Sequence, residues 1–257
     1  MESGTDQIYF SGDYSEWAEA LRQCATYDAG HILERVLSAT LKVRRGEPIE
    51  QKDGVFFGRV PYNFALISAL LSAAIHSGNR LSVLDFGGSL GISYFHSRDF
   101  LRDILEVAWS VVELPNFVAA GKKHLESKEL CFYETIEDCM RNHNPNIVVL
   151  SGVLQCLAHP WETLKSLLKI GAPYVFIDRT GMIESDRDRL TIQHVPEWIY
   201  RVEKPVWFLS EKKLRSCLPA TNYVCLCDFA ATDNYTLPGA KISFKGFICQ
   251  KNRDGPG

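Results

Sequence analysis

Hydrophobic and polar residues follow two different periods along the chain, and the change falls near residue 80. Before it, apolar residues recur at helical spacing, as in Trp17 and Leu21 and again in Ile32 and Val36. After it, short runs rich in Val, Ile and Leu alternate with helical stretches. This alternation predicts βαβ units and a parallel sheet with helices on both faces, which is an α/β fold.

The apolar runs after residue 80 predict seven strands. The first five are expected at 82–86, 108–113, 130–132, 147–150 and 174–178, with helices between them, and the last two at 222–230 and 242–250. A loop with no helical pattern joins the last two strands. At least one of them should therefore run antiparallel at the edge of the sheet.

The same pattern suggests how the chain is divided. We expect a helical N-terminal extension over 1–80, a main domain over 81–251 and a flexible tail over 252–257. The stretch 179–210 is longer than the usual connection of about 2–6 residues between a strand and a helix. It should form an excursion from the sheet.

Composition excludes several classes of protein. The 257 residues are 46% hydrophobic and 23% charged, which is typical of a globular chain. A net charge of -3 provides no general field for nucleic acid, and no apolar run approaches the roughly 20 residues of a membrane span. The polar, acidic start predicts no signal peptide, and eight cysteines without a Cys-x-x-Cys favour free thiols in the cytoplasm over disulfides or a zinc site.

The stretch from Leu81 to Phe95 carries the most information about chemistry. An apolar strand ends in Asp85, and Gly87, Gly88 and Gly91 follow before a helix begins. Glycines at the carboxyl end of such a strand let the backbone approach a ligand closely. The spacing is neither the G-x-G-x-x-G of a dinucleotide site nor the G-x-x-x-x-G-K-[ST] of a phosphate loop.

A second acidic residue, Glu113, closes the next strand. A carboxylate at this position can accept hydrogen bonds from both hydroxyls of a ribose. It also suits a ligand that carries positive charge.

These residues resemble the first motifs of a class I S-adenosylmethionine (SAM)-dependent methyltransferase. The usual pattern is acidic-x-Gly-x-Gly-x-Gly, and this chain has Ser89 in place of the middle glycine. The resemblance implies a Rossmann-like fold of seven mostly parallel strands in the order 3-2-1-4-5-7-6, with an antiparallel last strand and SAM as cofactor. The residues that it assigns to the cofactor are Asp85, Gly87, Gly88, Ser89, Gly91, Glu113, Leu114, Glu134, Thr135 and Ser151.

A narrower resemblance extends over nearly the whole chain. It is similar to a family of bacterial proteins assigned as methyltransferases, some of them encoded among surface-polysaccharide genes. The matching stretches begin at Gly12, Val112, Asp178, Leu190 and Lys245. The resemblance implies a small polar acceptor, a sugar hydroxyl or a biosynthetic intermediate, and O-methylation as the reaction.

An oxygen acceptor that is not yet ionised gains from a general base. Three residues should fall on the ligand edge of the sheet, and in falling order of preference they are His194, His159 and Asp178. For Asp178 the alternative is a structural ion pair with Arg179. No metal signature is present, although a metal-assisted reaction through Asp178 stays open.

Two other functions are alternatives to methyl transfer onto a small acceptor. A protein of this fold could bind SAM or S-adenosylhomocysteine (SAH) and act as a cyclising or pericyclic catalyst, or as a binding subunit. A nucleic-acid methyltransferase is disfavoured by the acidic balance and by Ser151-Gly-Val-Leu, where amino-methylating enzymes often carry Asn/Asp-Pro-Pro-aromatic. The aromatic residues of 179–210, Trp198, Trp207 and Phe208 among them, suit a sugar or another flat polar acceptor.

Overall fold

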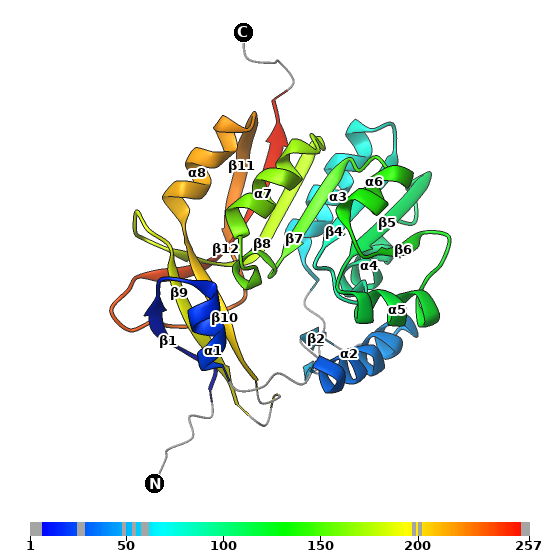
Figure 1. The fold of residues 1–257 in the computed structure, drawn as a ribbon. Coiled ribbons are helices and arrows are strands. Elements are labelled where there is room, and N and C mark those ends of the chain that lie inside the picture. Colours follow the sequence, from blue (N-terminus) through cyan, green and yellow to red (C-terminus); the bar gives the residue numbers. More distant parts are fainter. Residues whose placement is uncertain are drawn as a thin grey trace. The chain divides into compact units, whose positions relative to one another are not determined.

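The computed structural model describes residues 7–24, 29–47, 50–52, 55–57, 62–196, 199 and 202–252 (Figure 1). The chain forms two compact units. Unit 1 comprises residues 1–28, 152–170 and 177–257, and unit 2 comprises 29–151 and 171–176. Among the described residues, no helix has both the length and the apolar character needed to cross a bilayer.

Unit 2 is built on four parallel strands, which are the first four that the sequence predicts. They lie in the order β7 (Ile147–Ser151), β4 (Arg80–Phe86), β5 (Glu106–Val112) and β6 (Leu130–Tyr133). Neighbouring residues of β4, such as Val83 and Leu84, are both buried although they point to opposite faces. Burial on both faces is typical of a parallel sheet covered by helices.

The helices of unit 2 begin and end where local sequence dictates. Asn63 caps α3 by accepting a hydrogen bond from the Leu66 amide, and Pro115 starts α5. The elements are α2 (Ala29–Arg44), β2 (Glu50–Lys52), β3 (Val55–Phe57), α3 (Phe64–His76), α4 (Ile92–Ser97), the 3-10 turn η1 (Arg98–Phe100), α5 (Pro115–His124) and α6 (Ile136–Asn142). Gly121 lets α5 pack against β6, because a Cβ there would lie 2.6 Å from the Phe132 ring.

Unit 1 contains the remaining strands of the expected sheet. β8 (Tyr174–Ile183), whose first residues belong to unit 2, pairs with β12 (Ile242–Lys251), and β12 pairs antiparallel with β11 (Tyr223–Ala230). The neighbours of each strand match the expected order 3-2-1-4-5-7-6. The helical elements beside them are η2 (Leu154–Cys156), α7 (Pro160–Lys169) and α8 (Glu211–Ala220). The chain therefore has the predicted α/β, Rossmann-like fold.

Three further strands of unit 1 form an antiparallel sheet that the sequence did not predict. Their order is β1 (Tyr9–Tyr14), β9 (Arg189–Val195) and β10 (Val202–Ser210), and the last two residues of β10 pair parallel with β8. One cluster in this part of the unit contains Phe10, Val206 and Phe208. A second contains Leu190 and Ile192 with Ala20 of α1 (Trp17–Gln23).

One expectation needs correction here. The extension over 1–80 is not wholly helical, because 9–14 is a strand. This strand pairs with β9, a partner distant in sequence, which local periodicity does not report. The stretch 179–210, expected to form an excursion, contains the antiparallel hairpin of β9 and β10. Trp198 and all of the expected tail except Asn252 lie outside the described residues. The family resemblance also implies that the extension over 1–80 covers the active site, and this role stays a prediction.

Candidate functional site

The glycine-containing turn after β4 has the backbone conformation that its sequence predicts. Gly87 and Gly91 have φ of 71° and 75°, in the left-handed region that favours glycine. Ser89, the residue that departs from the usual motif, also has a positive φ, of 54°. The chain thus keeps the conformation of the missing glycine at the cost of local strain, of a kind that occurs at ligand-binding turns.

Asp85 lies beneath this turn and is 1% exposed. Its Oδ2 accepts a hydrogen bond of 3.0 Å from Trp109 Nε1, whereas Oδ1 has no hydrogen-bond partner among the described residues. A Cβ at Gly88 would lie 2.4 Å from this carboxyl group, so only glycine fits above it. Burial raises the pKa of Asp85 to about 7, and the nearby charge of Glu113 adds to the shift.

Glu113 meets the same turn from the end of β5. Its carboxylate accepts a hydrogen bond of 2.6 Å from the Leu114 amide and another from the Ser89 amide. Burial raises the pKa of Glu113, and these two amides oppose the rise. Leu114 follows with a side chain that is 60% exposed, a large apolar group left in solvent beside the carboxylate. The structure thus brings Glu113 together with Asp85 and Ser89, which lie more than 20 residues earlier in the sequence.

The remaining predicted cofactor residues follow the neighbouring strands of unit 2. Glu134 and Thr135 come directly after β6, and Ser151 is the last residue of β7. Because these strands are parallel, their carboxyl ends lie along one edge of the sheet. Thr135 has a structural task as well, since its hydroxyl caps α6 by accepting from the Asp138 amide at 3.0 Å. Glu134 is exposed.

His194 of unit 1 has an ordered environment that the sequence did not reveal. Its Nδ1 lies 3.0 Å from Glu203 Oε1 and its Nε2 lies 2.7 Å from Ser11 Oγ. The Tyr9 ring stacks on the imidazole with centroids 4.4 Å apart. A carboxylate at Nδ1 orients the imidazole as in many histidine general bases, while Nε2 contacts the hydroxyl of the protein's own Ser11.

The other two base candidates differ from His194. His159 is exposed and occupies the N-cap position of α7 without a capping hydrogen bond from its side chain. Asp178 is 3% exposed, and its Oδ1 accepts from the Arg179 amide at 2.7 Å. The Arg179 guanidinium pairs instead with Asp233, at 3.0 Å.

Sequence reasoning missed several residues of these environments. Trp109, Ser11 and Glu203 carry no motif, and each becomes relevant only through contacts across strands. Strand alternation could have placed Ser11 on the same face as Tyr9, but only if the strand itself had been recognised. Among the described residues, no group of three or more His, Cys, Asp or Glu side chains is arranged to hold a metal ion.

Comparison with known proteins bears on the fold. No protein-family model matches the sequence, and no curated protein matches it either. The N-terminal domain of EvdMO1, solved in the presence of SAH and D-fucose, has a TM-score of 0.50 and 13% identity and covers 88% of this chain and 98% of that one. A likeness at this identity shows the fold alone.

Two further solved structures resemble this chain with lower TM-scores. Magnesium protoporphyrin IX methyltransferase ChlM from Synechocystis PCC 6803, with bound SAM, has a TM-score of 0.48 at 10% identity, covering 89% of this chain and 99% of that one. The 1,6-didemethyltoxoflavin N1-methyltransferase of Burkholderia thailandensis has a TM-score of 0.42 at 18% identity, covering 88% and 92%.

Proposed function

We propose that the chain is a SAM-dependent methyltransferase that acts on a small polar acceptor. The observation that carries this proposal is the convergence of Glu113 on the turn at Ser89, with Asp85 beneath it. Two carboxyl groups at one turn favour a cationic ligand, and Glu113 is placed to accept hydrogen bonds from ribose hydroxyls. The fold shared with a domain solved in the presence of SAH supports the same cofactor.

Each remaining residue has a defined task under this proposal. The backbone of Gly87, Gly88 and Gly91 leaves room for the amino-acid part of SAM, and the exposed Leu114 side chain offers an apolar surface for adenine. Glu134, Thr135 and Ser151 border the same edge. When bound, SAM supplies an activated methyl group, so the protein mainly has to position the acceptor.

The acceptor is proposed to be a sugar hydroxyl or a biosynthetic intermediate, methylated on oxygen. His194 is the first choice of base, because Glu203 fixes its Nδ1. His159 and Asp178 follow. The EvdMO1 domain was solved in the presence of D-fucose, which supports the choice of a sugar as the proposed acceptor. The alternative, a protein that binds SAM without transferring its methyl group, is distinguished by measuring SAH formation.

A calorimetric titration with SAM tests the proposal. We expect saturable micromolar binding to the wild-type protein, and at least about tenfold weaker binding to Glu113→Ala, because up to two charge-assisted hydrogen bonds of about 1.5–3 kcal/mol each are lost. Glu106→Ala is the matched control, since Glu106 begins the same strand β5 and is exposed. Equal affinity of Glu113→Ala and the wild type would remove Glu113 from the site, and no binding at millimolar SAM would contradict the proposed cofactor.

A further inference from the structure

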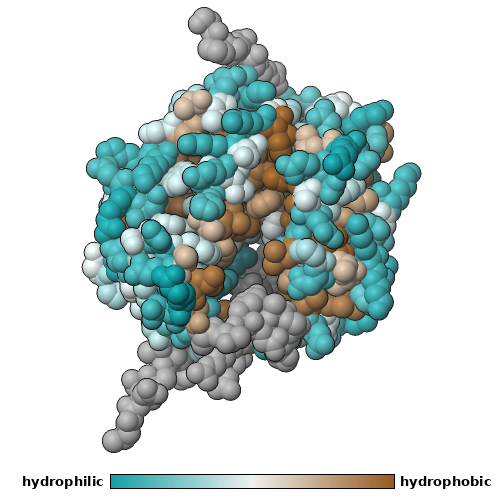
Figure 2. Space-filling view, in the orientation of Figure 1, coloured by the Kyte–Doolittle hydropathy of each residue, from teal (hydrophilic) through white to brown (hydrophobic). Residues whose placement is uncertain are grey.

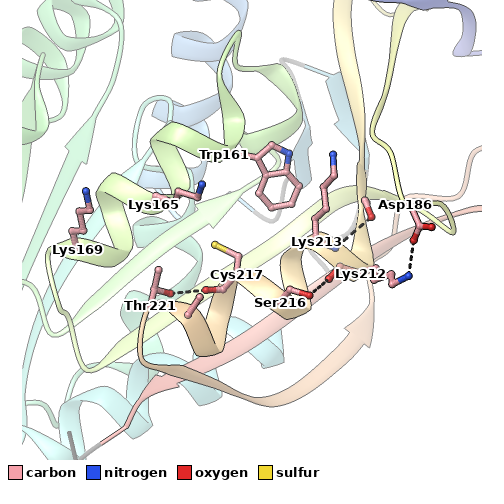
Figure 3. Close-up of a pocket in the computed structure, with 11 residues that line it drawn as sticks. Trp161, Lys165, Lys169, Asp186, Lys212, Lys213, Ser216, Cys217 and Thr221 are labelled. Atoms are coloured by element: carbon pink, nitrogen blue, oxygen red, sulfur yellow. Dashed lines mark hydrogen bonds and ion pairs between the residues drawn. The ribbon is translucent and has the colours of Figure 1, made fainter. Parts of the chain in front are cut away.

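A cleft in unit 1 lies between α7 and α8 and shares no residue with the proposed cofactor site. Its volume is about 810 Å³, within the range of about 300–1,000 Å³ of small-molecule sites. Each helix presents one stripe of side chains to it. The lining residues that the argument uses are Trp161, Lys165 and Lys169 of α7 and Lys212, Lys213 and Cys217 of α8 (Figure 3).

The cleft is strongly positive although the chain as a whole has a net charge of -3. Four lysines line it, and Asp186 is the one acidic residue in the described lining. Lys212 is paired with Asp186 at 2.7 Å. Lys165 and Lys169, one helical turn apart on α7, have no carboxylate partner within ion-pair distance among the residues that the structure describes. Two neighbouring ammonium groups without partners favour an anion.

One end of the cleft is held in a fixed geometry by Asp188. Its carboxylate accepts hydrogen bonds from Trp161 Nε1 at 2.9 Å, from the Ser210 amide at 2.7 Å and from Lys213 Nζ at 2.8 Å. The Asp188 side chain is only 12% exposed. Three donors on one nearly buried carboxylate fix the indole of Trp161 and the start of α8 relative to each other.

The floor of the cleft is less polar than its rim. Trp161 and Cys217 are half-buried, whereas the four lysines are exposed. Burial raises the pKa of the Cys217 thiol, and the positive charge of Lys165 opposes that rise. Over α7 and α8, Figure 2 shows hydrophilic residues with smaller hydrophobic areas between them. The ligand that fits is a flat apolar ring joined to an anionic group.

From this arrangement we infer that the cleft between α7 and α8 binds a small aromatic anion, with its ring against Trp161 and its phosphate or carboxylate group between Lys165 and Lys169. The inference does not depend on the proposed methyltransferase activity. If SAM did not bind, this inference would still hold. If the cleft bound no aromatic anion, the proposed SAM site would be unaffected.

The probe for the test is 1-naphthyl phosphate, which lacks the adenosine that the SAM site would recognise. Its fluorescence anisotropy is followed during titration with the wild-type protein and with the double variant Lys165→Glu/Lys169→Glu. We expect saturable binding to the wild type and at least about tenfold weaker binding to the variant, because two attractive charges become repulsive. Lys122→Glu/Lys123→Glu, the same change at two exposed lysines of α5, should bind as the wild type does.

Two comparisons locate the binding and give the result that would overturn the inference. The probe should slow alkylation of Cys217, measured by peptide mass spectrometry at pH 8.5, and leave Cys131 of unit 2 unaffected. 1-Naphthol and inorganic phosphate should each bind more weakly than the probe. Equal affinity of the wild type and the Lys165/Lys169 variant, binding of 1-naphthol as tight as that of the probe, or no protection of Cys217 would each refute the site.

Discussion

At the scale of single residues, the features that define the candidate site are carboxylates whose surroundings differ from water. Asp85 is buried beneath a turn and has one oxygen without a hydrogen-bond partner among the described residues. Glu113 uses two backbone amides, one of them from the turn itself. Motif spacing selected both residues, but only their surroundings explain how they can act together.

The raised pKa of Asp85 predicts a pH-dependent stability. Its pKa is about 7 in the folded protein against 3.8 as the reference, so between these values the folded state binds more protons than the unfolded state. The free energy of unfolding should therefore fall as pH rises from about 4 to about 7, by up to roughly 4 kcal/mol at 1.36 kcal/mol per pKa unit. Asp85→Asn, which keeps an acceptor for Trp109, should largely lose this dependence.

Urea denaturation at several pH values between 4.5 and 8 measures the effect. Asp99→Asn is the control, because Asp99 is an exposed residue of η1 and the chemical change is the same. If Asp85→Asn and Asp99→Asn show the same pH profile, the buried carboxyl group is not the origin of the slope.

The environment of His194 leads to a second prediction at this scale. His194→Ala should lower turnover with the true acceptor by about 10²–10⁴-fold, the usual contribution of a general base, and leave SAM affinity unchanged. Product mass and SAM titration are the two readouts. His124→Ala, at the end of α5, is the control. Unchanged turnover would show that His194 is not the general base and would favour His159 or Asp178 instead.

At the scale of elements, β1 is a strand that the sequence missed and whose partner lies far away along the chain. β1 pairs with β9, about 180 residues later, with Tyr9 opposite His194. Phe10 points to the other face and is 4% exposed, with its ring edge-on to Phe208 at 4.9 Å. Tyr9 and Phe10 thus alternate between an exposed and a buried face because β1 pairs with β9.

This alternation predicts opposite results for two neighbouring residues. Phe10→Ala should destabilise the protein by about 3–5 kcal/mol, because it leaves a cavity beside Phe208. Tyr9→Ala, next to it and 44% exposed, should cost about 1 kcal/mol or less. Urea midpoints of the two variants measure the difference. Similar losses in both variants would show that β1 does not bury Phe10 as described.

At the scale of the whole molecule, the proposed cofactor residues and the proposed bases belong to different compact units. Every cofactor candidate lies in unit 2, and His194, His159 and Asp178 all lie in unit 1. The chain passes between the units at Ser151–Gly152, directly after the last cofactor candidate. Binding of SAM and proton transfer are therefore assigned to separate parts of the chain.

Hydrogen exchange can test this assignment. Saturating SAM should slow amide exchange in peptides covering 85–91, 113–114 and 134–135, because a ligand stabilises the segments that hold it. Peptides from β9 and β10 should show no comparable change. The Glu113→Ala protein at the same SAM concentration should show weaker protection. Slowing confined to β9 and β10 would contradict the placement of the cofactor in unit 2.

The sequence alone determined the α/β fold, the seven principal strands and the position of the glycine-containing turn. These follow from local periodicity and motif spacing, which act within about 30 residues, whereas the order of the strands was implied by the family resemblance. Tertiary structure decided the rest: that Trp109 holds Asp85, that Ser11 and Glu203 face His194, and that 9–14 and 189–210 form a sheet. Each of these depends on hydrogen bonds and packing between different strands, whose pairing local sequence patterns do not report.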